Sequence, residues 1–298
     1  MTARAGSGRR LDSGNVPRRL KPVLLGASRA LGRATSSART LPSFLIVGAQ
    51  RCGTTSMYRT LAQHPAALKP VRQKGVHFFD TDYGKGLGWY RAHFPLELTA
   101  RSVRKGTGAR PLAFESSPYY MFHPLAGQRI AQDLPDVKLL ILLRDPVERA
   151  YSAYTHELAR GFETEPFEAA LELEPERLRG EAERLSADPD YYSHAHQHNA
   201  YRTRGQYVEQ LDRLTAVFGR ERLQVVDSQD FFERPEAVYA AVLDFLGLPD
   251  LKTPVFERHN ARPRSQIPAS VQAELQQHFE PYDQRLGEWL GTVPSWRR

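Results

Sequence analysis

Short apolar runs recur along the chain from residue 41 onward and alternate with segments of helical periodicity. The runs are nearly continuous in apolar residues, which is typical of strands that are covered on both faces. Four runs predict buried strands, at residues 44–47, 112–114, 137–143 and 223–226. Strands that alternate with helices are usually joined by crossover connections. The pattern therefore predicts an α/β fold in which residues 41–298 form one domain around a parallel β-sheet flanked by helices.

The helices between these runs have recognisable ends. Asp145 suits an N-cap, Pro146 the first helical position, Glu148 the third position beyond the cap, and Gly161 the far end. We expect Asp145 to cap this helix, and not to bind magnesium after the preceding strand. Helices are predicted over residues 54–63, 146–160, 206–218, 235–246 and 268–278. The acidic stretch 165–190 and the His-rich stretch 191–199 are interpreted as an insertion that decorates the same domain.

The net charge of +7 is concentrated at one end of the 298-residue chain. Residues 1–40 contain nine Lys and Arg residues against one Asp, so the rest of the chain is close to neutral. A basic segment with Gly and Ser, and without sustained apolar periodicity, is typical of a disordered arm. A loose contact with a membrane surface through residues 20–31 is the alternative. Because the charge lies outside the domain, we expect no nucleic-acid partner.

Cysteine content and hydropathy set further limits. Cys52 is the only cysteine, so an intrachain disulfide is excluded and a reducing cytoplasm is the expected location. No apolar run approaches the roughly 20 residues of a membrane-spanning helix. The best N-terminal candidate for the apolar core of a signal peptide, at residues 23–27, is too short. We therefore expect no transmembrane segment.

The most informative segment is the stretch 44–58, in which a predicted strand runs into a Gly-containing loop and then into a predicted helix. Gly48 and Gly53 allow a tight turn, and the helix presents unpaired amides to an anion. The layout is that of a P-loop, but Thr54 stands where ATP- and GTP-binding loops have a lysine. The basic group is Arg51, inside the loop. The loop predicts a nucleotide donor other than a magnesium nucleoside triphosphate, and a strand-to-helix turn without ligand is the alternative.

The loop also resembles that of a known family. Residues 48–55 are similar to the 5'-phosphosulfate loop of sulfotransferases, in the branch of the heparan-sulfate and many bacterial enzymes. Segments 74–80, 86–90, 114–120 and 143–154 agree with this branch in order and spacing. The resemblance implies a P-loop-type sheet, 3'-phosphoadenosine 5'-phosphosulfate (PAPS) as the sulfuryl donor, and no metal. It implies donor binding by residues of the loop, namely Arg51, Cys52, Gly53, Thr54, Thr55 and Ser56.

The donor has a second anionic group, the 3'-phosphate, which needs a cation and a hydroxyl at a neighbouring strand end. Arg144 follows an apolar run, and its guanidinium can hold a phosphate with two hydrogen bonds. Ser152 lies two turns into the next helix, and a serine that bonds back to its own helix is the alternative. By resemblance, the family's matching Arg and Ser bind the 3'-phosphate. The resemblance also implies cofactor contacts for Tyr207 and for Arg262, whose basic segment is otherwise a surface loop.

Sulfuryl transfer needs a cation at the leaving oxygen and a base for the acceptor proton. Family enzymes usually supply the cation with a lysine in the loop, so the resemblance gives this electrostatic role to Arg51. In the heparan-sulfate branch the base is a Glu two residues before the position of His77, and here Gly75 occupies that place. His77 is the first candidate base because its free pKa is about 6.5. Simple packing of His77 beside two phenylalanines is the alternative.

Glu115, at the end of a predicted strand, is the second candidate base. It could instead orient His77 or pair with Arg51. The family often follows this Glu with a lysine, whereas the present chain has Ser116. His194, His196 and His198 alternate, but without a cysteine or a second cluster they indicate a solvated loop more than a metal site.

Two rival functions remain open at the level of the sequence. A P-loop kinase or NTPase is one, and Thr54 in place of the lysine weighs against it. A non-catalytic module that binds anions or RNA is the other, and it does not explain the pairing of Arg144 with Ser152. The sequence leaves open the oligomeric state and the class of acceptor, which could be a carbohydrate, a lipid or a small molecule with a hydroxyl or amine.

Overall fold

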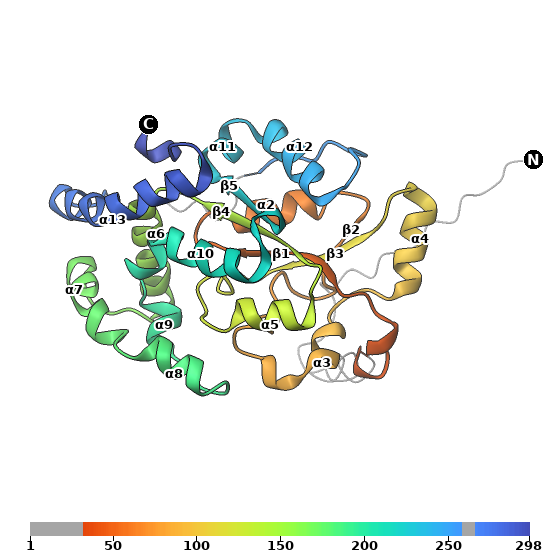
Figure 1. Ribbon diagram of the computed structural model, residues 1–298, viewed down its shortest axis with the longest axis horizontal. Coiled ribbons are helices and arrows are strands. Elements are labelled where there is room, and N and C mark those ends of the chain that lie inside the picture. The colour runs from red at the N-terminus through yellow and green to blue at the C-terminus, as the bar shows by residue number, and fades with distance from the viewer. Residues whose placement is uncertain (1–31, 258–265) are drawn as a thin grey trace, which may run out of the picture.

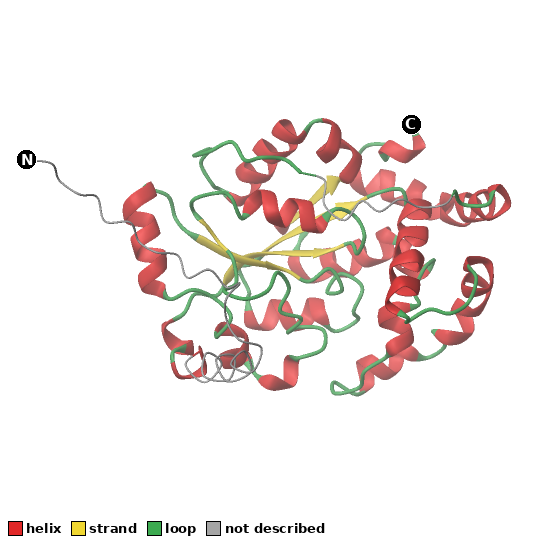
Figure 2. Cartoon of the chain, turned by 180° about the vertical axis from the view of Figure 1, so that it is seen from behind, coloured by secondary structure: helices red, strands yellow, loops and turns green. Residues whose placement is uncertain are grey.

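The computed structural model describes residues 32–257 and 266–298. Its centre is a five-stranded sheet in the order β2-β3-β1-β4-β5, with every neighbouring pair parallel. The strands are β1 (Pro42–Gly48), β2 (Ala67–Leu68), β3 (Leu112–Ser116), β4 (Lys138–Leu143) and β5 (Leu223–Asp227). Helices lie on both faces of the sheet (Figures 1 and 2). The predicted α/β fold with a flanked parallel sheet is therefore confirmed.

Helices alternate with the longer strands along the chain. The first half of the chain contributes α2 (Thr54–Leu61), α3 (Leu87–Arg91), α4 (Glu97–Thr107), α5 (Ala126–Asp133) and α6 (Pro146–Arg160). The second half contributes α7 (Phe167–Arg177), α8 (Glu181–Ala187), α9 (His194–His198), α10 (Tyr207–Phe218), α11 (Ser228–Glu233), α12 (Pro235–Leu246) and α13 (Ala269–Leu290). In Figure 1, α2, α11 and α12 lie on one side of the sheet and α5 and α10 on the other.

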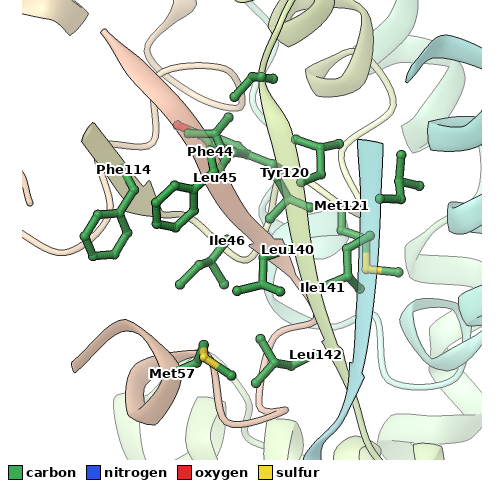
Figure 3. Packing of buried hydrophobic residues seen from close by; sticks show 14 of the residues in the cluster. Phe44, Leu45, Ile46, Met57, Phe114, Tyr120, Met121, Leu140, Ile141 and Leu142 are labelled. Atoms are coloured by element: carbon green, nitrogen blue, oxygen red, sulfur yellow. The ribbon is translucent and has the colours of Figure 1, made fainter. Parts of the chain in front are cut away.

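The core forms because the central strands are apolar on both faces. Phe44 of β1 stacks on Phe114 of β3 with 4.7 Å between ring centroids. Figure 3 shows apolar side chains of β1 and β4 packed together, with Met57 of α2 beside Leu142. Burial of such side chains stabilises a domain by about 1.5–3 kcal/mol each. The two central strands are thus held rigidly, and their carboxyl ends can position polar groups.

Several elements differ from the prediction. Strand β2 was not expected because two residues, Ala67 and Leu68, produce no periodic signal. Helix α6 has its predicted bounds, and the Asp145 carboxylate accepts a hydrogen bond of 2.9 Å from the Val147 amide, which confirms the cap. Helix α13 extends to Leu290, well beyond the predicted end, and it contains Pro281. Its inner face is fixed by tertiary packing, which overrides the local helix-breaking signal of the proline.

Residues 32–40 belong to the stretch predicted as an arm, and the structure places them against the domain. Thr40 N donates to Pro95 O at 2.9 Å, and the Arg39 guanidinium donates to Phe94 O at 2.6 Å. Arg91 in turn donates to Arg39 O. Residues 1–31, which carry seven of the nine basic side chains, lie outside the described residues.

Candidate functional site

One cavity of about 820 Å³ lies at the edge of the sheet where strands β1, β4 and β5 end. Parallel strands direct all their carboxyl ends to the same edge, and open α/β sheets bind ligands there. The loop after β1, the first residues after β4 and the start of α6 all contribute to the wall of the cavity. The residues predicted for binding and catalysis that line it are Arg51, Cys52, Gly53, Thr54, Thr55, His77, Arg144 and Ser152.

The loop after β1 turns through a left-handed residue into helix α2. Gly53 is the N-cap with a φ of 85°, a conformation that side chains with a Cβ rarely adopt. A Cβ on Gly53 would also lie 3.3 Å from the ring of Phe232. The loop therefore delivers the amides at the start of α2, with the hydroxyls of Thr54 and Thr55, to the cavity.

Two residues predicted to bind the donor, Ser56 and Tyr207, lie outside the lining of the cavity. Both residues are buried. Tyr207 OH donates to Arg144 O at 3.0 Å and lies 3.5 Å from Cys52 Sγ. The pKa of the Cys52 thiol is raised because burial disfavours the thiolate. Tyr207 thus contacts two residues that line the cavity, Arg144 and Cys52, without lining the cavity itself.

The cations of the cavity are distributed over two walls. Arg51 Nε donates to Ser152 Oγ at 3.1 Å, so this guanidinium is directed toward α6. Arg144 follows β4 and forms an ion pair with Glu148 at 3.0 Å on the same side. Arg51, Arg144 and Ser152 therefore form one group at the end of β4, although Arg51 and Ser152 are 101 residues apart in the sequence.

Lys74 is a third cation of the cavity, and the sequence analysis gave it no role. Lys74 Nζ donates to Thr55 Oγ1 at 3.0 Å and to Thr54 Oγ1 at 3.3 Å. It therefore reaches the start of α2 from a different loop, where a standard P-loop has its own lysine. Its signal in the sequence is weak, because Lys74 lies outside the P-loop-type loop and strand β2, which precedes it, has only two residues.

His77 lies beside Lys74 in the sequence and forms a pair with a buried carboxylate. His77 Nδ1 and Asp80 Oδ2 are 2.8 Å apart, and the side chains are 43% and 0% exposed. Burial lowers the pKa of His77, but the hydrogen bond and charge of Asp80, with Glu115 and Asp82 farther off, outweigh it and raise the pKa. Nε2 has no hydrogen-bond partner within residues 32–257 and 266–298. The ring is thus oriented with one nitrogen available.

Glu115 is fully buried and does not line the cavity. Its carboxylate accepts from Ser117 Oγ and Tyr120 OH, each at 2.7 Å, and from the Val76 amide at 3.0 Å. Burial raises its pKa, and these hydrogen bonds oppose the rise. Ser117 Oγ also accepts from the His77 amide at 3.0 Å. Glu115 therefore holds the segment that carries His77, and its oxygen atoms are occupied by that task.

The His-rich stretch is a helix, so the expectation of a solvated loop was wrong. His196 and His198 are buried in α9. His196 Nδ1 lies 2.8 Å from Tyr119 OH, and its ring stacks on Phe122 at 4.2 Å. His198 Nδ1 lies 3.0 Å from a carboxylate oxygen of Glu157 in α6. These contacts bury the imidazoles, which a single-sequence pattern does not reveal.

Three further predictions concern Arg262, membrane-spanning helices and metal sites. Arg262 lies outside the described residues. Within the two described ranges, no helix is both long and apolar enough to cross a membrane. No cluster of three or more His, Cys, Asp or Glu side chains suited to a metal ion occurs in the same part of the chain.

The fold and the loop define a P-loop-type α/β protein with a cationic cavity at the strand ends. Residues 41–282 match the sulfotransferase domain. The chain is 27% identical over 294 residues to human (Homo sapiens) heparan sulfate glucosamine 3-O-sulfotransferase 5, covering 91% of this chain and 78% of that protein. It is 28% identical over 232 residues to the bifunctional heparan sulfate N-deacetylase/N-sulfotransferase 1 of Caenorhabditis briggsae, covering 75% and 24%.

A solved structure shares both the fold and a part of the sequence. The sulfotransferase from Alicyclobacillus acidocaldarius superimposes with a TM-score of 0.65 at 31% identity, over 87% of this chain and all of that one. The chain belongs to the sulfotransferase family. It is therefore a transferase that moves a sulfuryl group to an acceptor.

Proposed function

We propose that this chain transfers the sulfuryl group of PAPS to a hydroxyl or amine of an acceptor. The observation that carries the proposal is the cavity with cations and hydroxyls on two separated walls: Thr54 and Thr55 at the start of α2, and Arg144 and Ser152 after β4. PAPS carries anionic groups at its 5' and 3' positions and supplies an activated sulfuryl group. Two such walls fit a donor with two charged ends better than a donor with a single polyphosphate chain.

Arg144 and Ser152 are suited to the 3'-phosphate. Arg144 is about one quarter exposed, and its ion pair with Glu148 leaves part of the guanidinium fork facing the cavity. A guanidinium holds a phosphate through two parallel hydrogen bonds, and a hydroxyl adds a third. The rings of Phe232 and Trp296 line the same cavity and offer apolar surface to an adenine.

His77 is the base of the proposed reaction. Asp80 accepts the Nδ1 proton, which leaves Nε2 as the acceptor of a proton from the attacking hydroxyl or amine. As the new bond from the acceptor to sulfur forms, the proton passes to Nε2. The old bond from sulfur to the bridging oxygen breaks, and that oxygen keeps the electron pair. Glu115 positions the segment that carries His77, because its carboxylate accepts hydrogen bonds from Ser117 Oγ and from the Val76 amide.

Calorimetry tests the donor, because the rival P-loop kinase or NTPase binds a magnesium nucleotide. The full chain is titrated with adenosine 3',5'-bisphosphate in metal-free buffer, and separately with ATP and magnesium. We expect binding of the bisphosphate without magnesium and weaker binding of Mg-ATP. Preferential binding of Mg-ATP would contradict the proposal and support the rival. Screening of carbohydrate, lipid and small-molecule acceptors with radiolabelled donor then identifies the acceptor.

A further inference from the structure

Arg51 and Lys74, two cations of the cavity, point to different walls. Arg51 comes from the loop itself, yet its Nε donates to Ser152 Oγ at 3.1 Å, on the wall of α6. Lys74 comes from another loop, yet its Nζ lies 3.0 Å and 3.3 Å from the hydroxyls of Thr55 and Thr54, the first residues of α2. The cation of the loop, Arg51, is thus directed toward Ser152 and α6, whereas a cation from another loop contacts the start of α2.

The position of Lys74 is fixed by the backbone around it. Ser116 N, at the end of β3, donates to Lys74 O at 3.0 Å. Two residues after Lys74, the Val76 amide donates to the Glu115 carboxylate. At Gly75 the backbone of this segment lies very close to β3, because a Cβ on Gly75 would be 2.5 Å from Ser116 O. Gly75 therefore allows the segment to lie against β3, and this contact directs Lys74 toward α2.

The surroundings of Lys74 suit an ammonium that receives an anion. Burial lowers its pKa to about 8, the charge of Glu115 opposes that change, and Arg59 adds to it. Among the described residues the hydrogen-bond partners of this ammonium are two hydroxyls. A partly desolvated ammonium gains strongly from a phosphate or sulfate oxygen, since the attraction is less screened than in water. An anion at the start of α2 would also meet the helix amides there.

We propose that Lys74 holds the 5'-phosphosulfate end of the donor, while Arg51 joins Arg144 and Ser152 at the 3'-phosphate. The division of roles rests on the proposed function, since it concerns the same donor. This division differs from the resemblance, which implies that Arg51 is the cation at the leaving oxygen. In this arrangement Lys74, not Arg51, neutralises the charge that gathers on the bridging oxygen when the bond to sulfur breaks.

A pair of ligands separates the two ends of the donor. Adenosine 3',5'-bisphosphate has both phosphates, whereas adenosine 5'-monophosphate lacks the 3'-phosphate. The affinity ratio between them measures what the 3'-phosphate contributes, and it is determined by calorimetry in metal-free buffer for the full chain and for the variants Arg51→Met and Lys74→Met. The assay needs no acceptor, so the unknown acceptor does not limit it.

We expect Arg51→Met to reduce the affinity ratio about tenfold or more, because it removes a charged hydrogen bond to the 3'-phosphate only. We expect Lys74→Met to weaken both ligands by about the same factor of ten or more and to leave the ratio unchanged. Lys69→Met is the matched control, since Lys69 is an exposed lysine on the same connection, and it should change neither affinity. Lys74→Gln serves as a second variant if Lys74→Met does not fold, with thermal unfolding as the measure of folding.

The opposite pattern would overturn the division of roles. If Arg51→Met weakens both ligands equally, or Lys74→Met lowers the ratio, then the loop arginine holds the 5' end as the resemblance implies. Failure of the unaltered protein to bind either ligand would instead reject the proposed function, and with it the division. The two failures are therefore distinguishable in one set of titrations.

Discussion

Two histidines of the cavity are each paired with a carboxylate through Nδ1, and their second nitrogen atoms differ. His77 pairs with Asp80 at 2.8 Å, and its Nε2 has no hydrogen-bond partner in the described part of the chain. His198 pairs with Glu157 at 3.0 Å, but its Nε2 lies 3.1 Å from Tyr192 OH. The first pair has a free site for a proton, whereas the second has none.

The carboxylates differ as well. Asp80 binds the imidazole and the amide of its neighbour Thr81, at the base of one short turn. Glu157 also binds the Arg160 guanidinium at 3.0 Å, so α6 and α9 share an ion-pair network around a buried charge. A His-carboxylate pair therefore does not by itself indicate catalysis. The pairs differ in whether a nitrogen atom of the imidazole is available and in whether the carboxylate also pairs with a second charged side chain.

The largest effect is expected from His77→Asn, which removes the proposed base and leaves a side chain of similar polarity. Turnover of the radiolabelled donor should fall about 10²- to 10⁴-fold, the usual contribution of a general base. The binding of adenosine bisphosphate should change little, because in the proposed reaction Nε2 contacts the acceptor and not the donor. His194→Asn, at an exposed position outside the cavity, is the control and should retain turnover. Unchanged turnover in His77→Asn would remove His77 from the mechanism.

Glu157→Gln tests the opposite role, in which the pair stabilises the fold. Removing this charge leaves Arg160 and His198 without their shared partner, so the free energy of unfolding should fall by about 3 kcal/mol. Urea denaturation measures the change. A variant as stable as the original protein would show that the network contributes nothing to stability, and the contrast between the two pairs would then rest on His77 alone.

Asp80→Asn should have an intermediate effect on activity. The amide can still contact the imidazole, but it no longer fixes the tautomer that leaves Nε2 unprotonated. Turnover at neutral pH should fall about tenfold, which is less than the loss of the base itself. Steady-state rates at saturating donor measure the change. A loss as large as that of His77→Asn would mean that Asp80 takes part in the proton transfer directly.

The smallest effect is a shift in the pH dependence. Only the neutral imidazole accepts a proton, so activity falls as pH falls through the raised pKa of His77, which lies above the usual value of about 6.5. In Asp80→Asn the profile should move toward lower pH, although Glu115 and Asp82 still act on the ring. By linkage, the pair contributes stability below pH 6.5 that is lost as pH rises through the raised pKa. A profile that does not move would detach the base from Asp80.

The sequence predicts the central part of the molecule well because that part is locally encoded. Apolar runs define the long strands, and Asp145, Pro146 and Gly161 define both ends of α6. The cavity residues that follow a strand directly, such as Arg144, could be found for the same reason. The prediction works where one short segment contains its own signal.

The rest depends on contacts between distant segments. Glu115 reads as an available carboxylate until Tyr120 and Ser117 are seen to occupy it. From the sequence, Arg51 is predicted to face an anion bound by its own loop, whereas in the structure its side chain donates to Ser152 in α6. Lys74 gains its place only through a backbone contact with β3. No periodicity or spacing along the chain encodes these pairings.

Gly75 has a consequence for the history and redesign of this enzyme. The heparan-sulfate branch, which this chain resembles, has a glutamate at the position of Gly75. In this chain the carbonyl oxygen of Ser116 lies 2.5 Å from where a Cβ at that position would be. A single codon change therefore cannot restore a glutamate without displacing the end of β3. The backbone contact thus opposes a carboxylate at position 75, and a redesign that introduces one must first move the end of β3.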